Sequence, residues 1–217
     1  MLRGWHWIVI AVGLASLASA AGGPSPPPVG GTPPPAPSRQ PLGRSLLDAR
    51  GLRKRLDEEP ELAEALLAFA ERKGWGEEHL DYFVAVVGNI ESGFDPQAVN
   101  PYTRATGLIQ FMPSTAKALG TTVEALATMT ATEQMPFVEK FFAGRTLENP
   151  RDIYPAIFYP AIIGKPDSFV LFRKGEKGYD QNRGLDKNND DVLTAGDVRA
   201  SADNAVFSLR QKARILV

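Results

Sequence analysis

One glutamate near the middle of the chain, Glu91, has neighbours that suit acid–base chemistry. It follows Val84 and Val87 by seven and four residues, a spacing that puts the three side chains on one face of a helix. Ser92 and Gly93 come next and predict that the helix ends there. An apolar face and the negative end of a helix dipole both oppose ionisation of a carboxyl. We therefore expect a raised pKa for Glu91, as a general acid working near neutral pH requires.

The residue types alone leave a second interpretation of Glu91 open, because a glutamate at a helix end is commonly an exposed surface residue. Ser92 could hydrogen-bond to the carboxyl and orient it. Asp95 is the one other acid close in sequence. It precedes Pro96 in a turn, where an aspartate commonly bonds its own backbone, so a second catalytic role is disfavoured.

Two motifs at a defined spacing surround this glutamate. Residues 91–94 have the sequence ESGF, and residues 107–113, after an intervening turn, have the sequence GLIQFMP. Over residues 86–120 the chain resembles the lytic transglycosylase family, the lysozyme-like enzymes known from the soluble lytic transglycosylase domain. The resemblance implies a mainly α, lysozyme-like fold. It also implies that Glu91 is the catalytic acid/base and that Ser92 supports it.

By the same resemblance, Gly107, Gln110 and Met112 line the glycan cleft beside the acid. The residue types agree, since Gly107 leaves room for a sugar to approach the backbone. Gln110 offers an amide donor and an acceptor that suit N-acetyl and hydroxyl groups. The family's Ala-Tyr-Asn-x-Gly segment has a degraded counterpart in which Tyr159 occupies the tyrosine position. Tyr154 is a rival for that role, and both tyrosines could instead be core aromatics.

The resemblance further implies a reaction that needs one carboxylate, where most glycosidases use two. Glu91 would protonate the bridging oxygen of the β-1,4 bond between N-acetylmuramic acid and N-acetylglucosamine. It would then take the proton of the muramic acid C6 hydroxyl as that oxygen closes on C1, giving a 1,6-anhydro end without water. Two alternatives stay open: a hydrolytic muramidase on the same fold, and a non-catalytic peptidoglycan-binding protein.

A second group of oxygen-bearing side chains lies near the C terminus, in residues 186–197. Loop positions 1, 3, 5, 9 and 12 carry oxygen ligands, as in EF-hand calcium loops. Position 6 is aspartate instead of glycine, and position 12 is aspartate instead of glutamate, so a solvated turn is the alternative. We expect a structural Ca²⁺ and no cofactor for catalysis. The expected ligands are Asp186, Asn188, Asp190, the Val192 carbonyl, Thr194 and Asp197.

The elements that must position these residues are predicted to be helices. Proline, glycine and capping signals favour helices over residues 60–74, 77–92, 113–120 and 130–143, the last opened by a Thr-x-x-Glu capping box. We expect residues 42–175 to form the lysozyme-like domain and residues 176–217 to hold the EF-hand-like loop and a C-terminal helix.

The segment before this domain predicts export. Arg3 precedes the apolar run 7–14, and Ala18-Ser19-Ala20 suits signal peptidase, so residues 1–20 are predicted to be a signal peptide. The mature protein would be periplasmic or secreted, and an uncleaved segment would tether it to the membrane. Proline-rich residues 21–41 predict a disordered linker.

Composition narrows the classes of partner and site. With 24 basic and 25 acidic residues, the formal net charge of −1 favours neither nucleic acid nor an anionic membrane. The absence of cysteine excludes disulfides, thiolate metal sites and a cysteine nucleophile. Trp75 and Phe94 could be sugar-stacking platforms, although buried packing is the favoured interpretation. We expect a monomer whose partner is the peptidoglycan glycan strand.

Overall fold

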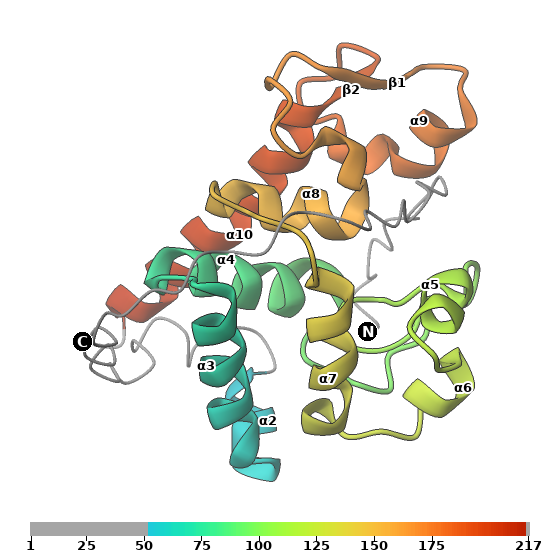
Figure 1. Cartoon of the computed structure of the whole chain (residues 1–217). Coiled ribbons are helices and arrows are strands. Elements are labelled where there is room, and N and C mark those ends of the chain that lie inside the picture. Colours follow the sequence, from blue (N-terminus) through green and yellow to red (C-terminus); the bar gives the residue numbers. More distant parts are fainter. Residues whose placement is uncertain (1–51, 216–217) are drawn as a thin grey trace, which may run out of the picture.

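The computed structural model describes the backbone of residues 52–215 and the side chains as far as residue 211 (Figure 1). The predicted signal peptide 1–20, the predicted linker 21–41 and residues 42–51 lie outside the described residues. Within them the chain is mainly helical with two short strands, which confirms the predicted fold class. None of the helices searched in this range is both long and apolar enough to cross a membrane.

The helix predicted over residues 60–74 begins and ends where its proline and glycine indicate. After α2 (Leu52–Glu58), α3 (Glu61–Lys73) begins behind Pro60 and ends at Gly74. Gly74 adopts a left-handed conformation with φ 65°, and its N–H bonds the carbonyls of Ala70 and Glu71, which closes the helix as a C-terminal glycine does. Leu62, Leu66 and Phe69 lie on the buried face of α3.

The next helix is more completely buried than α3, and it changes from an α-helix to a π-helix before it ends. In α4 (Glu77–Val86) every residue from Leu80 onward is buried. The α-helix stops at Val86 and continues as a π-helical turn, η1 (Val87–Glu91). The predicted single helix over 77–92 is therefore two elements. A wider turn of this kind rotates the residues that follow it away from the regular helical face.

The middle of the chain forms short helices on one side of the molecule, named α5 (Pro113–Ala118), α6 (Val123–Leu126) and α7 (Ala131–Phe142). The capping box predicted for α7 is present. Thr130 Oγ1 accepts from the N–H of Glu133, and the Glu133 carboxylate accepts from the N–H of Thr130. Helix α7 packs against α3, with Phe142 beside Phe69 in the aromatic part of the core.

The C-terminal half supplies shorter elements and one long helix. In chain order they are η2 (Pro150–Asp152), α8 (Ile153–Phe158), η3 (Pro160–Ile162), β1 (Val170–Arg173), α9 (Lys177–Asn182), η4 (Arg183–Leu185), β2 (Val192–Thr194) and α10 (Ala195–Ile215). Strands β1 and β2 pair antiparallel, with Phe172 opposite Leu193. Figure 1 shows β1, β2 and α9 together at one end of the molecule, away from α5 and α6.

Helix α10 joins this end to the half that holds Glu91, because it packs against both α4 and α8. Arg210 on α10 donates to the Asp81 carboxylate on α4 at 2.9 and 3.1 Å. Tyr82 on α4 donates to Asp203 on α10 at 2.7 Å. The predicted boundary between residues 175 and 176 stays a prediction, but the C-terminal helix shares a core with the helix that leads to Glu91.

Candidate active site

Glu91 is the last residue of η1, and its side chain is buried, with 5% of the residue exposed. Burial raises the pKa of its carboxyl from 4.5 to about 8, because the ionised form loses its hydration. Among the described residues no group donates a hydrogen bond to this carboxyl, and burial is the one cause of the shift. The carboxyl of Glu91 is therefore mostly protonated at neutral pH.

Tyr154 is the aromatic residue whose titration is linked to that acid. It lies on α8, which packs against α4, and it is completely buried. Burial and the charge of Glu91 raise the pKa of its hydroxyl well above 10, so it stays protonated. The hydroxyl has no hydrogen-bond partner among the described residues. The Tyr154 hydroxyl, which has no described hydrogen-bond partner, is thus close enough to Glu91 for the charge of that carboxyl to raise its pKa.

Tyr159, the residue placed at the family's tyrosine position, has a different environment. Its ring packs edge-on against Phe172 of β1, with the ring centroids 5.7 Å apart. It is half-buried, and it follows α8, where Tyr154 points into the core. The charge of Glu91 helps to raise the pKa of its rival, Tyr154.

Ser92 does not donate to the Glu91 carboxyl, which corrects the predicted contact. Its hydroxyl donates to the Leu108 carbonyl oxygen at 2.9 Å. A serine has a single hydroxyl proton, so Ser92 instead ties the segment after Glu91 to the loop that carries Gln110. The two predicted motifs are joined through this buried hydrogen bond.

Gly107 has a structural reason to be glycine that the sequence analysis did not predict. Its φ is +82°, and a Cβ there would lie 2.3 Å from Gln134 Oε1. The space that a side chain on Gly107 would occupy is therefore filled by the Gln134 side chain, and the role of Gly107 in the glycan cleft stays a prediction. The absence of a side chain lets the loop close onto α7.

In the described part of the chain, the side-chain amide of Gln110 is hydrogen-bonded at its nitrogen but not at its oxygen. Its Nε2 donates to the carbonyls of Ala98, at 3.2 Å, and Gly107, at 3.0 Å. Its Oε1 is buried and has no partner among the described residues. The donor half is thus used internally, and the acceptor half alone could take a hydrogen bond from a ligand N–H or O–H.

Two other residues of the sequence analysis lie near the motifs. Met112 is half-buried and immediately precedes α5, and its place in the glycan cleft stays a prediction. Asp95 is exposed and accepts from the N–H of Gln97 at 2.9 Å, the local turn bond predicted for it. Asp95 is therefore engaged with its own turn, while Glu91 is the buried acid of this region.

Gln134 is the residue that the sequence analysis missed. It is completely buried on α7 and accepts from the N–H of Leu108 at 2.9 Å. Its Nε2 donates to the carbonyls of Pro96, at 2.7 Å, and Leu126, at 2.9 Å. A glutamine on an otherwise apolar helix face was the signal available in the sequence, because a buried amide must find partners. Gln134 holds the Gly107 loop in place.

The predicted calcium loop has an ordered conformation of its own. Asp186 accepts from the Tyr179 hydroxyl at 2.7 Å and from the N–H groups of Asp190 and Asp191. Asp191 adopts φ 64° at loop position 6 and makes the sharp turn without glycine. At the start of α10, the Asp197 carboxylate accepts from the N–H and hydroxyl of Thr194, and the Thr194 hydroxyl oxygen accepts from the N–H of Asp197. No three acidic, histidine or cysteine side chains in the described part of the chain gather to hold a metal.

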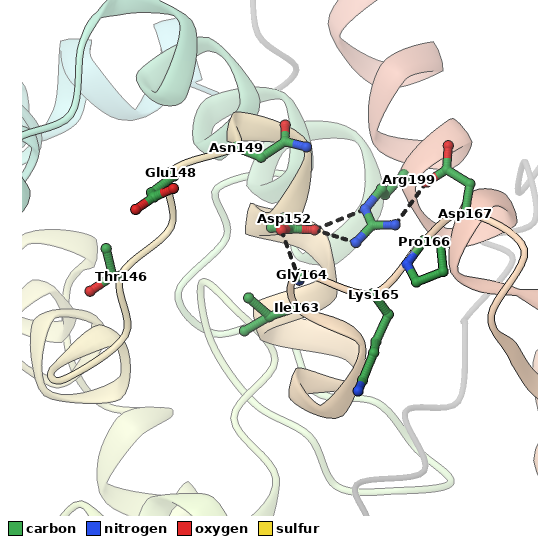
Figure 2. Close-up of a pocket in the computed structure, with 10 residues that line it drawn as sticks. All are labelled: Thr146, Glu148, Asn149, Asp152, Ile163, Gly164, Lys165, Pro166, Asp167 and Arg199. Atoms are coloured by element: carbon green, nitrogen blue, oxygen red, sulfur yellow. Dashed lines mark hydrogen bonds and ion pairs between the residues drawn. The ribbon is translucent and has the colours of Figure 1, made fainter.

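A separate pocket of about 360 Å³ lies between residues 146–149 and 163–167. Figure 2 shows its floor, where Arg199 of α10 bonds Asp152 on one side and Asp167 on the other. Asp152 also accepts from the N–H of Gly164. None of the predicted catalytic or glycan-binding residues lines this pocket. The paired charges on its floor fasten α10 to η2 and to the loop before β1.

Comparison with known proteins adds one finding to this geometry. Searches of curated proteins and of solved structures found no match. Residues 69–135, from Phe69 in α3 to Met135 in α7, match the family model described as the Transglycosylase SLT domain, which supports the lytic transglycosylase family for the segment that holds Glu91 and Gln110.

Proposed function

We propose that the chain is a peptidoglycan lytic transglycosylase in which Glu91 acts first as a general acid and then as a general base. The observation that carries the proposal is the burial of Glu91, which raises the pKa of its carboxyl to about 8. An acid with this pKa is protonated at neutral pH and becomes a usable base once its proton has gone. The family match over residues 69–135 points to peptidoglycan as the substrate.

In the proposed reaction the proton of Glu91 moves to the oxygen that bridges N-acetylmuramic acid and N-acetylglucosamine. The bond from C1 to that oxygen breaks through an oxocarbenium-like state. The C6 hydroxyl of the muramic acid then forms a bond to C1 and returns a proton to Glu91. One glycan bond is exchanged for one anhydro ring, no water is consumed, and the enzyme ends as it began.

Tyr154 fits this cycle as a positioning residue. After the first proton transfer Glu91 is a buried carboxylate, which is costly without a donor. The Tyr154 hydroxyl is protonated and lacks another partner among the described residues. Its O–H would stabilise the carboxylate and hold it toward the substrate until the C6 proton arrives.

The test is product analysis with Glu91→Gln as the matched variant. Mass spectrometry of digested sacculi should show 1,6-anhydro ends with the wild-type protein. Glu91→Gln, which keeps size and removes the proton donor, should reduce turnover by about 10²- to 10⁴-fold. Reducing ends in the wild-type digest would establish the hydrolytic muramidase instead. Full turnover in the variant would refute the role of Glu91. Binding of glycan strands by the wild-type protein without any cleavage would favour the non-catalytic alternative.

We also propose that the protein acts outside the cytoplasm, either in the periplasm or after secretion. The support is the predicted signal peptide 1–20, which lies outside the described residues. N-terminal sequencing of the protein recovered from the cell envelope should begin at Ala21. An N terminus at Met1 on membrane-bound protein would show that the segment is retained as an anchor.

Calcium binding by residues 186–197 is a further proposal. It is supported by the positive φ at loop position 6 and by the Asp186 hydrogen bonds to the N–H groups of Asp190 and Asp191, which give the loop a compact turn. The ion would pin the start of α10. Calorimetric titration with Ca²⁺ should give heat in the wild type and in Asp180→Ala, an exposed acid just outside the loop, and none in Asp186→Ala. No heat in the wild type would remove the proposal.

A further inference from the structure

The loop between Glu91 and α5 contains a small hairpin with an exposed aromatic residue at its tip. Val99 pairs with Thr106, which also pairs with Phe111. Tyr102, at the turn between the paired residues, is 81% exposed. It is the most exposed large hydrophobic residue in the described part of the chain, and Val99 on the same hairpin is 45% exposed.

The backbone beneath Tyr102 is held firmly although its ring is uncovered. The buried Asn100 side chain accepts from the N–H groups of Tyr102, at 2.9 Å, and Thr103, at 3.1 Å. The Asn100 carbonyl accepts from the N–H of Arg104 at 2.8 Å. The Arg104 side chain pairs with Glu124 on α6. The backbone that carries the ring is therefore held in place, which lowers the entropy lost when a ligand binds.

The base of the hairpin belongs to the candidate active site. Ala98, just before it, accepts both from the N–H of Gly107 at 2.9 Å and from Gln110 Nε2 at 3.2 Å. The carbonyl of Leu108, the residue after Gly107, accepts from the Ser92 hydroxyl, and Ser92 follows Glu91 in the sequence. Through these hydrogen bonds the loop of residues 107–110 connects the segment that holds Glu91 to the base of the hairpin that carries Tyr102.

The two aromatics that the sequence suggested as sugar platforms are not available for that role. Phe94 is 1% exposed, and Trp75 is 8% exposed and packs on Phe69 with the ring centroids 4.9 Å apart. Two other exposed aromatics of the described chain lie in its C-terminal part, Phe169 just before β1 and Phe207 on α10. Tyr102 is the exposed aromatic on the segment that adjoins the acid.

We propose that Tyr102 is a glycan-binding platform, on which a sugar of the strand stacks beyond the pair of sugars whose bond is cleaved. An aromatic ring offers a flat apolar surface to the C–H face of a pyranose, and the phenol hydroxyl can bond a sugar hydroxyl at its edge. Tyr102 loses only two side-chain rotations on binding. The proposal rests on the proposed function, because the strand must also reach Glu91.

The test measures binding and cleavage separately. Binding of soluble peptidoglycan glycan strands is measured by calorimetry in the Glu91→Gln background, in which the ligand is not consumed. Tyr102→Ala should weaken binding by about three- to tenfold, as loss of an aromatic contact does. Tyr102→Trp should keep the affinity. In the active enzyme Tyr102→Ala should raise KM by a similar factor and leave kcat nearly unchanged, since the reacting bond is elsewhere.

Phe207→Ala is the matched control, because Phe207 is also an exposed aromatic, 61% exposed on α10. Unchanged binding in Tyr102→Ala, or an equal loss in Phe207→Ala, would overturn the platform and leave the role of Glu91 standing. If binding depends on Tyr102 but the wild type releases no anhydro ends, the proposed reaction is wrong and the platform stands. A wild type that binds no glycan strand would refute both.

Discussion

The burial of Glu91 should make the stability of this protein depend on pH in a way that one substitution removes. The folded protein raises the pKa of this carboxyl from 4.5 to about 8. Between those values the unfolded chain has released the proton and the folded chain has kept it. Unfolding therefore releases a proton, and raising the pH favours it.

The magnitude follows from these two pKa values. Stability should fall by about 1.4 kcal/mol for each pH unit between 4.5 and 8. The whole effect is about 5 kcal/mol, a large part of the 5 to 15 kcal/mol that stabilises a typical domain. The contribution of the neutral carboxyl is complete below pH 4.5 and is lost as the pH rises through about 8. Glu91→Gln keeps a neutral side chain of the same shape and should escape this loss.

The assay is urea denaturation, followed by far-UV circular dichroism, at pH values from 5 to 9. The variant and the wild type should have similar free energies of unfolding near pH 5. The variant should then become the more stable of the two by several kcal/mol at pH 8. Glu71→Gln on α3, an exposed glutamate, controls for the loss of one negative charge. A difference between Glu91→Gln and wild type that does not change with pH would show that the carboxyl is hydrated, and the reasoning for Glu91 would fail.

Three other substitutions test Tyr154, the Gly107 loop and the ion pairs of Arg199. Tyr154→Phe should slow turnover about tenfold or more and move the pH–rate profile to higher pH, because the ionised Glu91 would lose the donor that we propose for it. Gly107→Ala should lower the free energy of unfolding in urea by about 3 kcal/mol, because a left-handed φ and a close contact are strained together. Arg199→Met should lower it by about 3 to 5 kcal/mol, since Asp152 is left buried and unpaired.

Each of these substitutions has a matched control in the chain. Tyr159→Phe should leave the pH–rate profile unchanged, and an equal shift there would undo the choice of Tyr154. Gly120 has φ +81°, and a Cβ at this position would meet nothing within 4 Å, so Gly120→Ala should cost about 1 kcal/mol from backbone strain alone. Lys174 pairs with Asp191 on the surface, so Lys174→Met should change stability by less than about 0.5 kcal/mol.

The predictions that hold best are those that depend on residues a few positions apart. The Thr130 capping box, the end of α3 at Gly74 and the turn bond of Asp95 are all local, and each is present. The apolar spacing that ends at Glu91 likewise predicts a buried acid, and Glu91 is 5% exposed. Helix periodicity, caps and turns are short-range properties, so the order of residue types determines them.

The tertiary structure decided which partners these residues meet. Ser92 was expected to bond its neighbour but bonds Leu108, and the space at Gly107 is taken by Gln134 from another helix. The choice between the two tyrosines likewise depends on how α8 packs against α4.

The burial of Glu91 could thus be predicted from the sequence itself, from the apolar residues that precede it. The division of the Gln110 amide, the tyrosine linked to the acid and the exposure of Tyr102 were decided only when distant segments packed together. A hydrogen bond between distant residues depends on the path of the whole chain between them. The pattern of neighbouring residue types does not predict that path, because many different packings bury the same apolar face.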